Sequence, residues 1–186
     1  MGVARAEEAR RRGAEVVLLA ANLAVPAPAG VETIATSTAE EMLEAALALV
    51  DVDLAVLAAA VADYRPAAAL PGKRAKSGEP WTLELEPTAD IARALGERRR
   101  PGQVLVLFGA EHGEEGLERK RRMLDDKGAD LVVYNDVSRG DIGFDSAENE
   151  VVLVGRELER RVPKAAKERI AAAILDEAER LLEAAR

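Results

Sequence analysis

Cysteine is absent from the 186 residues of this chain, and histidine occurs only once. Without cysteine there is no disulfide framework, no thiolate nucleophile and no Cys-based zinc or iron–sulfur site, and a single histidine excludes a multi-histidine metal centre. Any chemistry must therefore use carboxylates, lysines, asparagines, hydroxyl groups and the backbone.

Long uncharged apolar runs and an excess of basic residues are also missing. No stretch of eighteen apolar residues reads as a membrane span, and the first residues, "MGVARAEEARRR", form a charged helix pattern rather than a signal peptide. We expect a cytoplasmic protein. The net charge of −8 argues against broad nucleic-acid binding, because a phosphate backbone favours a basic face.

Apolar runs alternate with amphipathic helix patterns along the chain. Strands are expected at 14–20, 31–36, 53–62, 104–108 and 129–134, and helices at 2–13, 40–50, 89–100 and 114–128. Parallel strands need helical crossovers, so this order predicts a doubly wound, mostly parallel, Rossmann-like α/β sheet covered on both faces. A single nucleotide-binding domain over residues 1–186 is expected.

The C-terminal part departs from simple alternation. The segment 149–155, "NEVVLVG", follows the loop "GFDSAENE" with Phe144 and is expected to be an antiparallel edge strand, and Pro163 is expected to open the last helix. An edge strand needs protection from open-ended pairing, which favours a symmetric dimer. Ser37 with Glu40 and Thr88 are the expected helix caps.

The start of the chain differs from that of an ordinary doubly wound domain. Such folds begin with a strand and a glycine-rich turn that feed the first helix, whereas this chain opens with the helix itself. We therefore expect the first strand of the usual fold to be missing.

Three predicted strands end in polar or aromatic residues. "AAAVADYRP" ends in Asp63 and is followed by Lys73 and Lys76 on a loop, "VLVLFGAE" carries Phe108 and Glu111, and "VVYND" ends in Asn135 and Asp136. Ligands of open parallel sheets bind beyond the carboxyl ends of the strands. The small residues 58–60 leave backbone groups accessible to a base or ring, Phe108 is a candidate for stacking, and the lysines suit phosphates. A purely structural role, with Asp63 capping the loop and the lysines solvated, remains open.

Several linked motifs resemble one known family. "AAAVADYRP" followed by "KRAK", "LELEPTADIA", "VLFGAE", "LDDKGADLVVYNDV" and "GFDSAENEVVLV" are similar in order and spacing to phosphopantothenoylcysteine synthetase, the synthetase domain of the bacterial bifunctional coenzyme A biosynthesis protein. The resemblance implies a ligase that joins 4′-phosphopantothenate to cysteine with CTP and Mg²⁺ or Mn²⁺, through an acyl-cytidylate. It also implies a homodimer and a fused or associated flavin-dependent decarboxylase.

The resemblance also assigns site residues by position. It makes Lys73 the catalytic lysine of a flexible loop, places the backbone of 57–59 and the side chain of Asp63 at CTP, and matches Lys127 to the second of two paired lysines. The positions that it assigns to the nucleotide are Leu57, Ala58, Ala59, Asp63, Lys73, Thr88, Ala89, Asp90, Ile91, Phe108 and Lys127. The metal ligands are not assigned.

The chain departs from the family pattern at four places. Met123 stands where the first paired lysine is expected, Ala89 replaces a proline, and His112 replaces a small polar residue. The family's glycine-rich turn and its "SNxSSGxMG"-type segment are expected upstream of Met1, so the asparagine that acts on the acyl-cytidylate is not in this sequence. Two alternatives therefore stay open: a catalytically incompetent nucleotide-binding or dimerisation module, and an NAD(P)-dependent oxidoreductase, although no G-x-G-x-x-G follows a strand here.

Overall fold

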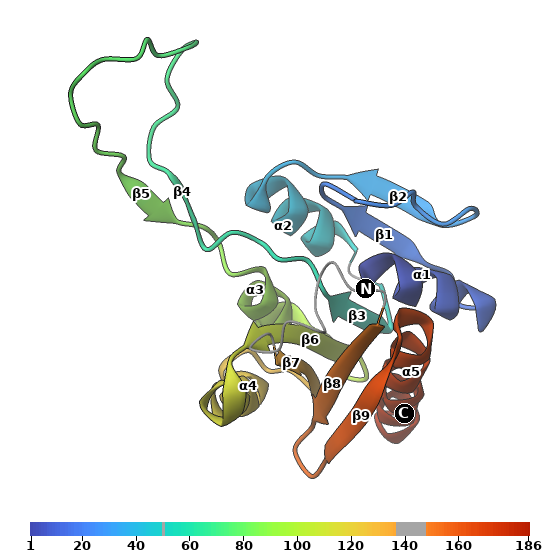
Figure 1. The fold of residues 1–186 in the computed structure, drawn as a ribbon. Coiled ribbons are helices and arrows are strands. Elements are labelled where there is room, and N and C mark those ends of the chain that lie inside the picture. The colour runs from blue at the N-terminus through green and yellow to red at the C-terminus, as the bar shows by residue number, and fades with distance from the viewer. Residues whose placement is uncertain (50, 137–147) are drawn as a thin grey trace.

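The computed structural model describes residues 1–49, 51–136 and 148–186 as an α/β fold (Figure 1). The expected turn "GFDSAENE" with Phe144 lies largely outside these residues. The helices are α1 (Gly2–Arg11), α2 (Ala39–Ala48), α3 (Ile91–Arg98), α4 (Gly113–Asp126) and α5 (Lys167–Ala184). The strands are β1 (Val17–Ala20), β2 (Glu32–Ala35), β3 (Leu54–Leu57), β4 (Tyr64–Pro66), β5 (Leu85–Pro87), β6 (Val104–Glu111), β7 (Leu131–Asp136), β8 (Glu148–Val154) and β9 (Glu159–Ala166).

The central sheet has the strand order β3-β6-β7-β8-β9. The first three strands are parallel to one another, while β8 pairs antiparallel with β7 and β9 antiparallel with β8. This confirms the predicted α/β class with a mostly parallel sheet and an antiparallel strand near the C-terminus.

Two details of the C-terminal prediction are wrong. The antiparallel strand β8 is not an edge strand, because β9 covers its outer side. Pro163 lies inside β9 and not at the start of a helix, and α5 begins at Lys167. Proline is tolerated there because β9 is the edge of the sheet, where an outward-facing backbone position needs no donor.

The N-terminal strands form a separate sheet. β1 and β2 pair in parallel, and neither is hydrogen-bonded into the five-stranded sheet among the described residues (Figure 1). The strand predicted over 53–62 stops at Leu57, because the alanines that follow lead out into the extended segment that carries β4. The single continuous sheet that the sequence predicts is therefore replaced by two sheets, one formed by β1 and β2 and one that begins with β3.

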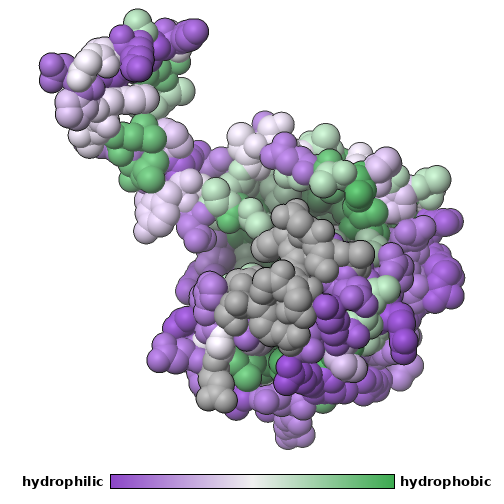
Figure 2. Space-filling view, viewed as in Figure 1, coloured by the Kyte–Doolittle hydropathy of each residue, from purple (hydrophilic) through white to green (hydrophobic). Residues whose placement is uncertain are grey.

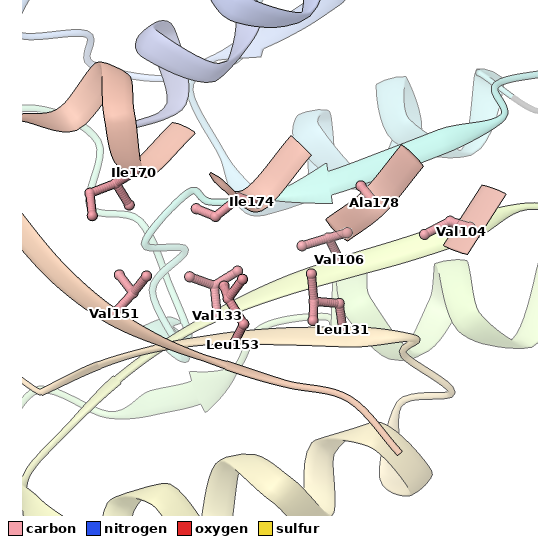
Figure 3. Packing of buried hydrophobic residues seen from close by; sticks show 9 residues of the cluster. All are labelled: Val104, Val106, Leu131, Val133, Val151, Leu153, Ile170, Ile174 and Ala178. Atoms are coloured by element: carbon pink, nitrogen blue, oxygen red, sulfur yellow. The ribbon is translucent and has the colours of Figure 1, made fainter. Parts of the chain in front are cut away.

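The core has two apolar clusters, one on each face of the central sheet. On one face, Val106, Leu131 and Val133 pack under Ile170 and Ile174 of α5, as Figure 3 shows. On the other face, Leu105, Leu107 and Val132 pack with Leu124 of α4. The near-continuous apolar strands β6 and β7 are buried on both sides, as parallel strands usually are.

Helix α1 is held against α5 by charged groups. Glu8 accepts hydrogen bonds from Arg11 and Arg12, and Arg12 also bonds Asp176 at 2.8 Å and Glu179 at 3.1 Å. Glu8 is only 8 % exposed, and the hydrogen bonds from the two arginines lower its pKa to about 2.

In the part of the chain described, no helix is both long and apolar enough to span a membrane.

Two expected helix caps are shifted along the chain. Thr38, not Ser37, caps α2 by accepting from the Glu41 amide at 3.1 Å, while the Glu41 carboxylate accepts from the Ser37 amide. Asp90, not Thr88, caps α3. In both caps, a short polar side chain directly before the first helical turn accepts a hydrogen bond from a backbone amide of that turn.

Between Tyr64 and Pro87 the chain leaves the body as an arm (Figure 1). Its base is the antiparallel pair β4–β5, which continues with a bond from the Ala67 amide to the Glu84 carbonyl at 3.0 Å. The arm carries Lys73, Lys76 and Trp81 beyond the paired residues.

Candidate functional site

The carboxyl ends of three parallel strands meet at one edge of the central sheet. β3 ends at Leu57, and β6 and β7 end at Glu111 and Asp136, which lie opposite each other in the register. Polar groups that follow these strands therefore share one edge, as the sequence predicts.

Thr88 closes the base of the arm onto the segment after β3. Its amide donates to the Asp63 carbonyl at 2.9 Å, and its hydroxyl donates to the Ala62 carbonyl at 2.5 Å. These bonds fix the backbone around Asp63 while its carboxylate stays exposed. Two of the predicted nucleotide residues, far apart in the sequence, are thereby neighbours.

Asp90 and Lys127 form an ion pair that the sequence analysis did not foresee. Asp90 Oδ1 accepts from the Arg93 amide at 3.0 Å as the cap of α3, and its other oxygen accepts from the Lys127 ammonium. Burial works to raise the pKa of Asp90, but the hydrogen bonds from Lys127 and the Arg93 amide outweigh it and hold the pKa below its ordinary value. The Asp90 carboxylate is therefore held in its charged form.

A glycine allows Lys127 to reach this position. A Cβ on Gly96 of α3 would lie 2.0 Å from the Lys127 carbonyl oxygen, so only glycine lets the end of α4 come this close. Gly128, with φ +62°, then ends the helix as the sequence predicts. The lysine side chain extends from this contact to the start of α3.

The structure also shows where four further positions lie that the resemblance assigns to the nucleotide. Ala58 and Ala59 continue past the last paired residue of β3, and the Ala59 side chain is exposed. Ala89 is exposed, whereas Ile91 is 8 % exposed and anchors the start of α3 in the interior. Ala89 and Ile91 thus flank Asp90 along the chain, while Ala58 and Ala59 lie just past the carboxyl end of β3.

Phe108 lies on the opposite face of the sheet from this pair. It packs against the cluster under α5, and the guanidinium carbon of Arg5 lies 3.8 Å from the centroid of its ring. Arg5 is 3 % exposed, its two terminal nitrogens have no hydrogen-bond partner among the described residues, and burial lowers its pKa to about 9. A base can stack on this face of the ring only if Arg5 moves.

The structure does not bring Lys73 to the other candidates. The lysine is exposed on the arm, which extends away from the carboxyl edge of its own sheet (Figure 1). Lys73 can therefore reach the other assigned residues only if the arm moves or if a second molecule supplies the lysine.

The polar residues that the sequence predicts at the ends of β6 and β7 have partners on α4 that the sequence analysis did not identify. Glu111 accepts from Arg119 at 3.0 Å and lies 3.6 Å from Lys120, and these contacts, led by the Arg119 hydrogen bond, lower its pKa. Asp136 accepts from the Gly113 amide at the start of α4 at 3.3 Å. Lys120 also lies close to β6 at Gly109, where a Cβ would lie 2.4 Å from the Lys120 side chain.

No metal site is evident in the part of the chain that the structure describes. Within residues 1–49, 51–136 and 148–186, no three carboxylate or histidine side chains are grouped to hold an ion. Asn135 Oδ1 is buried and has no hydrogen-bond partner among the residues described. It is a free oxygen ligand, but one oxygen alone does not make a metal centre.

The fold and the position of these groups define a class of protein. A mostly parallel α/β sheet with charged groups beyond its strand ends is a Rossmann-like fold, a class whose ligands bind beyond the carboxyl ends of the strands. Residues 1–182 match the model of the DNA/pantothenate metabolism flavoprotein C-terminal domain, and the chain belongs to that family.

Named relatives agree with this assignment. The chain is 44 % identical to the coenzyme A biosynthesis bifunctional protein CoaBC of Thermococcus kodakarensis, over 98 % of this chain and 45 % of that protein. It is 37 % identical to the CoaBC of Bacillus subtilis, over 87 % of this chain and 40 % of that protein. The chain thus spans less than half the length of these relatives. The crystal structure of a CoaBC C-terminal domain superposes with a TM-score of 0.79, at 33 % identity, covering 98 % of this chain and 82 % of that one. The resemblance read from the sequence motifs is confirmed.

Proposed function

We propose that this chain is the ligase domain of a coenzyme A biosynthesis protein, which joins 4′-phosphopantothenate and cysteine at the expense of CTP. One observation carries the proposal: residues assigned to the nucleotide from three separate segments meet at the start of α3. Thr88 holds the backbone at Asp63, and Lys127 reaches Asp90 from the end of α4. The names of the relatives support the pathway.

The proposed reaction has two transfers. A carboxylate oxygen of 4′-phosphopantothenate attacks the α-phosphorus of CTP, the bond to the bridging oxygen breaks, and pyrophosphate leaves. The amine of cysteine then attacks the acyl carbon, an amide forms, and CMP leaves as the amine loses a proton. Both steps bring anions together, so cationic groups and fixed positions are the main requirements.

Each side chain would meet one of these requirements. Lys127, already held over the start of α3, supplies positive charge beside the phosphates, and Lys73 adds a second cation from the arm. Asp63 and the open backbone at Ala58 and Ala59 orient the base. A divalent ion, when bound with the triphosphate, neutralises charge on the leaving group.

The proposal includes the molecular context expected from the sequence. It comprises one nucleotide-binding domain over 1–186, a homodimer, a fused or associated flavin-dependent decarboxylase, and a cytoplasmic location. An exposed edge at β8 does not support the dimer, because β9 covers β8.

Calorimetric titration tests the nucleotide site. We expect CTP with Mg²⁺ to bind more tightly than ATP or NADPH, and Lys127→Ala to weaken CTP binding at least about tenfold, the effect of losing one charge-assisted contact. Lys164→Ala is the matched control, because Lys164 also faces a carboxylate, Glu148, but lies on β9. Tighter binding of NADPH would support an oxidoreductase instead.

Pyrophosphate release then separates the ligase from a module that only binds nucleotide. Release of pyrophosphate from CTP that depends on 4′-phosphopantothenate supports the ligase. Selective CTP binding with no such release supports the module, in which the site is present without the reaction.

A further inference from the structure

Arg5 is a buried cation without an anionic partner. It is 3 % exposed, and both of its terminal nitrogens are buried with no hydrogen-bond partner among the described residues. Two other arginines of α1 differ, because Arg11 and Arg12 both bond Glu8. Hydrophilic residues otherwise cover much of the face of the body that Figure 2 shows. An uncompensated charge in the interior is costly, so a partner from outside the chain is expected.

The ring of Phe108 contacts the face of this guanidinium and leaves its edge free. The guanidinium carbon lies 3.8 Å from the ring centroid, a distance that fits a cation lying over the face of the ring. The N–H donors of a guanidinium lie in its own plane. Burial lowers the pKa of Arg5 only to about 9, so the group is charged at neutral pH. Arg5 can therefore donate two parallel hydrogen bonds to a carboxylate while it stays over the ring.

Asn135 places an unpartnered acceptor on the same face of the sheet. Its Oδ1 is buried and has no hydrogen-bond partner in the part of the chain described. Alternate residues of a strand share a face, and Asn135 follows Val133, which lies in the cluster under α5 against which Phe108 packs. Phe108 lies opposite Val133 in the register, so the Cα atoms of Phe108 and Asn135 are about 8 Å apart. A buried donor and a buried acceptor, both without partners, thus lie on one face.

Both groups lie toward the carboxyl edge of the sheet. Figure 3 shows Val104, the first residue of β6, at one end of the cluster under α5, and Val151 and Ile170 at the other. Phe108 continues β6 toward that second end, and Asn135 is the last residue but one of β7. Ligands of such sheets bind beyond the carboxyl ends of the strands. The two unpartnered groups therefore lie where a ligand is expected.

Together the two groups select a ligand that carries an anion and a hydrogen-bond donor side by side. A carboxylate satisfies the guanidinium of Arg5, and an adjacent amine satisfies the oxygen of Asn135. A phosphate group alone would bring only further acceptors to that oxygen. An α-amino acid carries its carboxylate and its amine on one carbon atom, which matches the combination.

We propose that Arg5 and Asn135 bind an α-amino acid, with its carboxylate on the Arg5 guanidinium and its amine on Asn135 Oδ1. The identification of this amino acid as cysteine rests on the proposed function. A hydrogen bond from the amine to Asn135 fixes the nitrogen, while the lone pair stays available for attack on the acyl carbon. The pair would thus orient the nucleophile of the second transfer.

Calorimetric titration with three thiols tests the assignment. L-cysteine has both groups, cysteamine lacks the carboxylate, and 3-mercaptopropionate lacks the amine. Since the chain has no cysteine, these thiols form no disulfides with it. We expect the wild type to bind L-cysteine at least about tenfold more tightly than either analogue, the effect of losing one charge-assisted contact.

Two variants show which group of the ligand meets which residue. Arg5→Met should weaken binding of L-cysteine and 3-mercaptopropionate at least about tenfold and leave cysteamine unchanged. Asn135→Ala should weaken L-cysteine and cysteamine and leave 3-mercaptopropionate unchanged. Arg10→Met is the matched control, because Arg10 is an exposed arginine of the same helix. A wild type that does not distinguish the three thiols, or an Arg5→Met variant that loses all three equally, would overturn the proposal.

Titration of the same samples with CTP reports separately on the proposed function. CTP binding, with L-cysteine binding unaffected by Arg5→Met, would support the ligase and contradict this site. L-cysteine binding that depends on Arg5, without CTP binding, would support the amino-acid site and contradict the ligase. If Arg5→Met weakens binding of 4′-phosphopantothenate and not of L-cysteine, Arg5 binds the carboxylate of that substrate instead and the proposal is wrong.

Discussion

The ammonium of Lys127 bonds the carboxylate of Asp90 and joins the end of α4 to the start of α3. Asp90 has a second task, because its other oxygen caps α3 by accepting from the Arg93 amide. One side chain thus fixes a helix terminus and positions a cation at the candidate nucleotide site.

Two substitutions separate these tasks. Asp90→Asn keeps an acceptor for the cap but removes the charge, and should lower the free energy of unfolding by less than about 1 kcal/mol, as expected for a partly exposed ion pair. Asp90→Ala removes both and should cost about 1 kcal/mol more. Urea unfolding measures the difference. Equal losses would mean that the cap contributes nothing.

Gly96 should tolerate no side chain. The Cβ of Gly96→Ala would lie 2.0 Å from the Lys127 carbonyl oxygen, which forces α3 and α4 apart. Overpacking of this kind costs about 1–3 kcal/mol. Thermal and urea unfolding should show the loss. Gly78→Ala is the control, since a Cβ there meets nothing within 4 Å. Matching stabilities of the two variants would refute the close contact.

Glu8 should make stability depend on acid pH. Its pKa in the folded chain is about 2, below the ordinary value of 4.5, so the stabilisation is complete above pH 4.5 and is lost as the pH falls toward 2. Urea unfolding of the wild type across this range should show a decline that is smaller in Glu8→Gln. An identical slope in the variant would assign the acid sensitivity to other carboxylates.

Arg5 should cost stability. Its guanidinium is buried beside Phe108 without a hydrogen-bond partner among the described residues. Arg5→Met keeps an unbranched chain over the ring and removes the charge, so it should raise the free energy of unfolding by more than about 1 kcal/mol. Unfolding at neutral pH measures this. A less stable variant would show that the charge is compensated.

Mixing two inactive variants should restore activity if Lys73 of one molecule serves the site of a second copy. In a heterodimer of Lys73→Ala with Asp63→Ala, one of the two sites has both residues, and statistical mixing then gives about a quarter of the wild-type rate. Pyrophosphate release measures it. No recovery in mixed dimers, with an active wild type, would place Lys73 at the site of its own chain.

The sequence by itself determined the α/β class and most of the element order. Long apolar runs such as 104–108 and 129–134 need burial on both faces, and helices with glycine stops lie between them, so local pattern and global fold agree. The linked motifs also identified the family, because their order and spacing are written in the chain. Asp63, Thr88, Asp90 and Lys127 were selected in this way.

Only the tertiary structure decided how these residues meet. The Asp90–Lys127 pair depends on a close approach at Gly96, and the contact of Arg5 with Phe108 joins the first helix to a strand about a hundred positions later; neither has a periodicity that a local reading detects. Pro163 became part of β9 because the edge of a sheet tolerates it. The arm is a further example. The sequence predicted a charged loop after Asp63, but the pairing of β4 with β5 and the bond of Arg65 to Glu40 of α2 are contacts between distant segments that only the structure shows.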